Sequence, residues 1–111
     1  MVNEILTASG IEYRQAWFPR LPANTCAVYF DDVEMDGPDP VTPLTSDGLP
    51  CVVHHDILVE MYEPKQDPAA EAALEAAIRA TGLTFKKYDR VWLQSLQRYQ
   101  VNYEFNYTTK T

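Results

Sequence analysis

The chain has 111 residues, of which 46% are hydrophobic and 12% aromatic, and its formal net charge is −7 at pH 7. This length fits one domain over residues 1–111 with a single modest core, and the apolar content argues against wholesale disorder. The negative charge argues against nucleic acid or an anionic membrane as the main partner, because both attract basic surfaces. No segment resembles a signal peptide, and none approaches the ~20 apolar residues of a membrane-spanning helix.

The first half of the chain predicts one helix followed by extended segments. Val2, Ile5 and Leu6 recur at helical spacing, so we expect a helix over residues 2–9 that stops at Gly10. Three extended segments are then expected: a short one over 11–19, a strand over 25–30 and a long strand over about 50–62.

An acidic segment, residues 31–48, separates the last two of these strands. It contains six carboxylates and three prolines but no basic residue. The carboxylates repel one another and the prolines block regular structure, so we expect a long flexible loop. Such a loop is either an assembly element that orders against a partner or merely a variable surface loop. The candidate interface residues are its six acids: Asp31, Asp32, Glu34, Asp36, Asp39 and Asp47.

A second helix is predicted over residues 67–82. Asp67 can cap its amino end, Pro68 suits the first helical position, and Gly82 can supply a left-handed stop. One face is apolar and rich in small residues, which lets the helix lie close to a sheet. We expect the remaining polar face, Glu71, Glu75 and Arg79, to point into water.

The end of the chain predicts two more strands. The first runs from about Phe85 to Leu93, and the join at 94–97 lacks Gly and Pro, so its turn type stays open. The second has an apolar face that we expect to be core or subunit interface rather than a stacking platform for single-stranded nucleic acid, because acids surround it. That face is Tyr99, Val101, Tyr103, Phe105 and Tyr107.

These elements predict an α+β fold. The order is helix, short strand, strand, long strand, helix, strand, strand. We therefore expect one mostly antiparallel sheet of about four to five strands, with two α-helices packed on one face. Such an architecture does not name a function.

The stretch 51–64 contains neighbouring histidines and several acids, which raises the question of a metal site. In a strand, His54 and His55 point to opposite faces, whereas His54, Asp56 and Glu60 share one face. A histidine with two carboxylates is a plausible ligand set. However, a strand spreads such groups over about 20 Å, and the spacing matches no helical zinc motif. We favour a solvated strand face and expect no metal site.

Catalytic patterns are scarce. The chain lacks a G-x-S-x-G elbow and a glycine-rich phosphate loop, and it has only four glycines. Cys26 and Cys51 could act as nucleophiles with His54 or His55 as base, but both thiols are expected on inward faces of strands, where they are inert. A disulfide between them stays open, and we favour buried thiols. We expect neither an enzyme nor a cofactor.

Three stretches of the sequence resemble a protein family. They are the aromatic opening Trp17-Phe18-Pro19, the strand residues 59–62 followed by Asp67-Pro68, and the ending over residues 97–105. With these features the chain resembles the prophage and siphophage tail terminator-like, or tail-completion, proteins, which are distantly similar to the lambda tail terminator. The resemblance covers nearly the whole chain except the acidic segment. Met61 departs from the expected leucine or isoleucine, which is harmless in a core.

The resemblance implies a structural virion protein with no site chemistry. It implies a ring, expected to be a hexamer, that caps the tail tube, ends its polymerisation and docks the head-completion or connector protein. The chain would act in the host cytoplasm during assembly and end in the virion tail or neck. DNA would pass through the ring without specific binding, which suits an acidic chain. A ring subunit buries edge strands against its neighbours, and we expect the strands at 50–62 and at the chain end to supply them.

Two alternatives stay open. Within the virion, the chain could be a head–tail connector or neck protein. Outside it, the chain could be a stand-alone protein-binding module of a bacterial host.

Overall fold

Two helices and six strands form the part of the chain that the computed structural model describes, residues 1–36 and 52–110. Their order along the chain agrees with the predicted order, except that the strand expected over 85–93 is divided in two. The elements are α1 (Val2–Ser9), β1 (Glu12–Gln15), β2 (Cys26–Asp36), β3 (Val52–Glu63), α2 (Pro68–Arg79), β4 (Lys86–Lys87), β5 (Val91–Leu93) and β6 (Arg98–Lys110).

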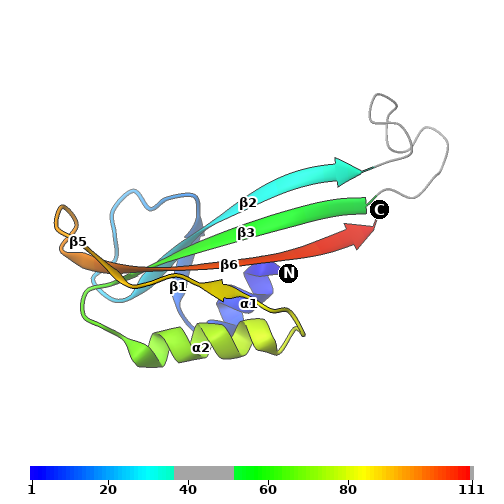
Figure 1. Cartoon of the computed structure of the whole chain (residues 1–111). Coiled ribbons are helices and arrows are strands. Elements are labelled where there is room, and N and C mark those ends of the chain that lie inside the picture. Colours follow the sequence, from blue (N-terminus) through cyan, green and yellow to red (C-terminus); the bar gives the residue numbers. More distant parts are fainter. Residues whose placement is uncertain (37–51, 111) are drawn as a thin grey trace.

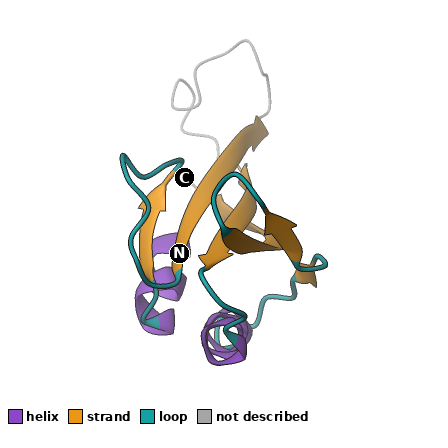
Figure 2. Cartoon of the chain, turned by 90° about the vertical axis from the view of Figure 1, so that its left-hand side faces the viewer, coloured by secondary structure: helices purple, strands orange, loops and turns teal. Residues whose placement is uncertain are grey.

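The strands form one mixed sheet in the order β1-β2-β3-β6-β4, with β5 pairing to the start of β6. Only the pairing of β1 with β2 is parallel among the described strands; the others are antiparallel. Both helices lie on the same side of the sheet (Figures 1 and 2). The predicted α+β class is therefore confirmed, with six strands instead of four to five.

Local signals in the sequence set the ends of both helices. Gly10 follows α1 with a left-handed φ of 75°, where its lack of a Cβ avoids strain. The carboxylate of Asp67 caps α2 by accepting a hydrogen bond of 3.1 Å from the backbone N–H of Ala70. This helix ends at Arg79, and Gly82, with φ 82°, lies in the turn that follows. Neither helix is long enough and apolar enough to cross a membrane.

The main core fills the space between the sheet and the two helices. Alternate residues of β3 and β6 point into it, so the predicted register of both strands is confirmed. Leu74 and Ile78 close it from α2, and Ile5 and Leu6 from α1. The central sheet residues, all fully buried, are Ile57, Val59, Met61, Val101 and Tyr103.

The expectation of an acidic loop over residues 31–48 is wrong for its first part. Residues 31–36, expected in a loop, continue β2, which pairs with β3 as far as Asp36 opposite Val52. Pairing with β3 satisfies the backbone groups of alternate residues in this segment, and this outweighs the weak strand propensity of its acids. The rest of the expected loop lies outside the described residues, as does Cys51.

Two further expectations are wrong. β3 lies between β2 and β6, so the long strand is not an edge of the sheet. The strand expected over 85–93 is interrupted, and its halves β4 and β5 pair separately with β6. The interruption coincides with Arg90, whose side chain turns toward buried carboxylates. The join at 94–97 is a turn in which Gln97 takes a left-handed φ of 53°.

Cys26 is buried, as predicted, but not in the main core. Its neighbours Ala27 and Tyr29 belong to that core, and the alternation of β2 puts Cys26 toward the opposite face. On this side Arg98 donates hydrogen bonds to the backbone carbonyls of Pro22 and Asn24. Burial raises the pKa of the Cys26 thiol, which keeps it protonated and unreactive.

Candidate interaction surface and buried carboxylate cluster

The far halves of the three longest strands form a projection that we call the arm: residues 30–36 of β2, 52–58 of β3 and 104–110 of β6. These segments pair in continuous register. The tip of the arm extends past both helices (Figure 1), in a chain whose extents are 52 × 28 × 22 Å. Four of the six predicted interface acids lie here, whereas Asp39 and Asp47 lie outside the described residues.

On the helix side of the arm, one of the acids takes part in a side-chain network. The carboxylate of Asp31 lies 3.0 Å from Nδ1 of His55. The imidazole stacks on the ring of Tyr107 with 4.6 Å between centroids, and its Nε2 lies 3.4 Å from the hydroxyl of Thr109. Asp31 is therefore held within the fold and is a weak candidate for direct contact with a partner.

On the opposite side of the arm, the acids are exposed. Asp32 lies directly across from Asp56, and two like charges in this position cost stability. A hollow here is lined by Phe30, which is 40% exposed, and by Leu58 and Glu104, together with the two acids. This combination suits a partner with basic and apolar side chains.

The three residues that were weighed as metal ligands lie along one face of β3. His54, Asp56 and Glu60 share this outer side, as their spacing predicted. In the two described ranges, no three His, Cys, Asp or Glu side chains are close enough to hold a metal ion. His54 and His55 point to opposite faces, which agrees with the strand interpretation.

A cluster of carboxylates, which the sequence did not predict, lies beneath the sheet at the start of α2. Glu63 is fully buried and Glu71 is 3% exposed, although Glu71 was expected to face water. Arg90 lies 2.5 Å from a carboxylate oxygen of Glu71 and 3.4 Å from one of Glu63. Lys87 lies 2.9 Å from an oxygen of Glu71 and 2.9 Å from one of Glu75. These ion pairs fasten residues 86–90 to the helix and the sheet.

The two buried carboxylates have opposite protonation tendencies. Burial, followed by the hydrogen bond with Glu71, raises the pKa of Glu63 to about 7. Burial also acts to raise the pKa of Glu71, but its hydrogen bonds with Glu63, Lys87 and Arg90 outweigh that effect and lower it. Below about pH 7 the pair therefore holds one proton, on Glu63.

This cluster connects several elements of the fold. The hydroxyl of Tyr103 donates to Glu75 at 2.8 Å, so the core strand β6 joins the same network. Lys87 and Arg90 join the carboxylates of α2 to the buried carboxyl of Glu63 at the end of β3. In the sequence, the basic residues at 87 and 90 are the feature that could have indicated this cluster. A partly buried basic side chain needs a carboxylate partner.

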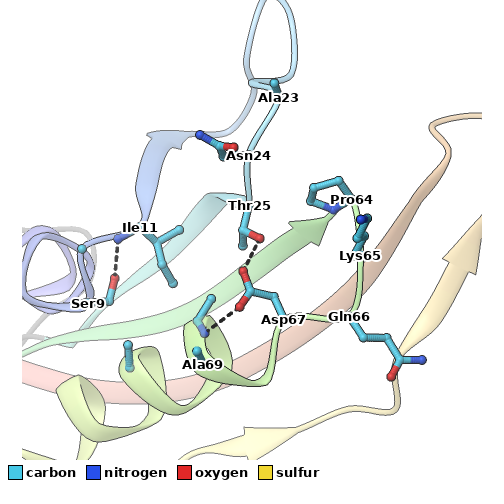
Figure 3. Close-up of a pocket in the computed structure, with 13 residues that line it drawn as sticks. Ser9, Ile11, Ala23, Asn24, Thr25, Pro64, Lys65, Gln66, Asp67 and Ala69 are labelled. Atoms are coloured by element: carbon cyan, nitrogen blue, oxygen red, sulfur yellow. Dashed lines mark hydrogen bonds between the residues drawn. The ribbon is translucent and has the colours of Figure 1, made fainter.

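A larger hollow lies between the end of α1 and the start of α2 (Figure 3). Asp67 is its one lining carboxylate. One of its oxygens accepts from the hydroxyl of Thr25 at 2.6 Å, and the other caps α2. Small side chains and backbone form much of the rest. Both oxygens of Asp67 are thus used within the fold.

Comparison with solved structures locates the fold among known proteins. A chain from the structure "Virion of native gene transfer agent (GTA) particle" aligns with a TM-score of 0.59, over 96% of this chain and 84% of that one. The chain shares its fold with a chain of that particle. The two sequences are 16% identical, so the likeness concerns the fold. No protein-family model and no curated protein matches the sequence.

Proposed function

We propose that the chain is a structural subunit of a phage-like virion, specifically a tail terminator. Six copies form a ring that caps the tail tube, stops its growth and docks the head-completion or connector protein. The observation that carries this proposal is the fold shared over nearly the whole chain with a chain of a virion. The sequence resemblance to tail terminator-like proteins supports the same assignment.

Features of the molecule support a role in assembly. The arm presents exposed acids and exposed apolar residues beyond the helices, and such surfaces are typical of contacts with other proteins. The exposed acids Asp32 and Glu34 are the interface residues that we retain from the predicted set. The net charge of −7 lets DNA pass through a ring without being held. In this proposal the chain assembles in the host cytoplasm and remains in the tail or neck.

Deletion of the gene from the phage-like element that encodes it tests this function. We expect filled heads and separate tubes of uncontrolled length in electron micrographs, because nothing would end tube growth. Supplying the wild-type chain from a plasmid should restore joined particles. Tubes of normal length that fail to join heads would instead assign the connector role. Infectious particles at the normal titre would contradict both assignments and favour a host binding module.

A further inference from the structure

Among the described residues, the outer edge of β2 has no strand partner along the arm. β1 ends at Gln15, and the last bond to this edge runs from the N–H of Ala16 to the carbonyl of Tyr29, at 2.9 Å. In an antiparallel ladder, every second residue directs its N–H and C=O away from the paired strand. Since Tyr29 does so, Asp31, Val33 and Met35 do so as well. No described strand pairs with these groups.

The outer edge of β6 likewise has no partner over the matching length in the part of the chain that the structure describes. The N–H of Tyr88 donates to the carbonyl of Asn102 at 2.9 Å, and the pairing with β4 ends at Glu104. By the same alternation, Asn106 and Thr108 direct their backbone groups outward. Within the described part of the chain, the arm therefore has one open edge on each side. Open edges are templates for pairing with another strand.

The two edges differ in charge. Residues 31–36 of β2 contain four acids and no base, whereas residues 105–109 of β6 carry no charge. Two β2 edges side by side would bring acids against acids, which costs stability. A β2 edge beside a β6 edge avoids that repulsion. Val33 and Met35 are 45% and 56% exposed, and such a contact would bury part of their apolar surface away from water.

We propose that the open β2 edge of one copy pairs with the open β6 edge of a second copy. This inference deepens the proposed ring by naming its interface. Each copy then uses two different surfaces, and such a head-to-tail contact closes into a ring when the rotation allows. β2 and β6 run in the same direction, because both are antiparallel to β3. If the second copy lies alongside with its helices on the same side of the sheet, its β6 therefore runs parallel to β2 of the first copy.

Paired cysteines test this arrangement. Met35 and Thr109 both lie opposite Val53, on the helix-side face. In a Cys51→Ser background, Met35→Cys with Thr109→Cys should yield, on oxidation, a ladder of covalent oligomers larger than a dimer. The pair Val33→Cys with Thr109→Cys tests the alternative in which β2 of one copy is shifted by two residues relative to β6 of the other. The matched control pairs Met35→Cys with Thr108→Cys, which points to the other face, and should give little product. Each single variant should remain monomeric on a non-reducing gel.

A proline variant provides a second readout. The N–H of Val33 points to the open edge, so Val33→Pro should spare the β2–β3 ladder but remove a donor from the contact. The control is Val33→Thr, which keeps this N–H. We expect Val33→Pro to have the same melting temperature as the control but to form no oligomers in native mass measurements. Rings that form without any cross-link, dimers from Met35→Cys alone, or full assembly of Val33→Pro would each overturn the edge pairing. None of these outcomes depends on the gene-deletion phenotype, so the edge pairing and the proposed function are tested independently.

Discussion

Replacing Phe105 by alanine should lower the free energy of unfolding by about 3–5 kcal/mol, because a large aromatic side chain leaves a cavity when it is removed from a core. Phe105 is 2% exposed and lies across from Ile57 in the pairing of β6 with β3. Urea denaturation monitored by circular dichroism would measure the change, with an unchanged dependence on urea concentration showing that the unfolding transition is the same.

Asn106→Ala is the matched control for that experiment. Asn106 is the next residue of the same strand and is exposed on the other face. Its replacement should cost well under ~1 kcal/mol, as is usual for surface positions. Equal costs at the two positions would mean that the register of β6 is shifted by one residue, which would turn its apolar set outward.

A second large effect should appear in the pH dependence of stability. The folded-state pKa of Glu63 is about 7, compared with an ordinary value of 4.5. Its contribution is therefore fully present below pH 4.5 and is lost as the pH rises through 7. A shift of this size corresponds to about 3 kcal/mol. Glu63→Gln imitates the protonated acid, so it should be nearly as stable as the wild type at pH 4.5 and distinctly more stable at pH 8.

Thermal unfolding of both proteins from pH 4 to pH 8 would measure this difference. Glu12→Gln, an exposed substitution on β1, serves as the control and should follow the wild-type profile. The lowered pKa of Glu71 acts in the other direction, since its contribution is lost as the pH falls below 4.5. A constant difference between wild type and Glu63→Gln at every pH would show that Glu63 does not bind its proton more tightly in the folded protein.

The features that the sequence predicted are those decided locally. The alternation of β6, the cap at Asp67 and the stop at Gly10 depend on neighbouring residues alone, and all three are present. The continuation of β2 through its acids depends on β3, which lies far along the chain. Composition favoured a loop there, and strand pairing overrode it.

The buried carboxylate cluster escaped prediction for a similar reason. Considered alone, α2 presents Glu71 on its polar face, and nothing in the helix indicates burial. The basic residues that cover it, Lys87 and Arg90, come from a later segment that bends back over the helix. The sequence predicted two contact elements of the ring, the acidic segment and the edges of the strands at 50–62 and at the chain end. It could not show that the first of these strands lies inside the sheet, because which strand edges remain open follows from the sheet order.

The most direct test of the proposed ring is the native mass of the purified chain, combined with negative-stain images. We predict a species six times the mass of one chain, seen as rings with a central hole. Dilution should shift it to monomers in one step, without a stable dimer, if all contacts in the ring are equivalent. A chain that stays monomeric at every concentration, and shows no ring in the images, would contradict this account.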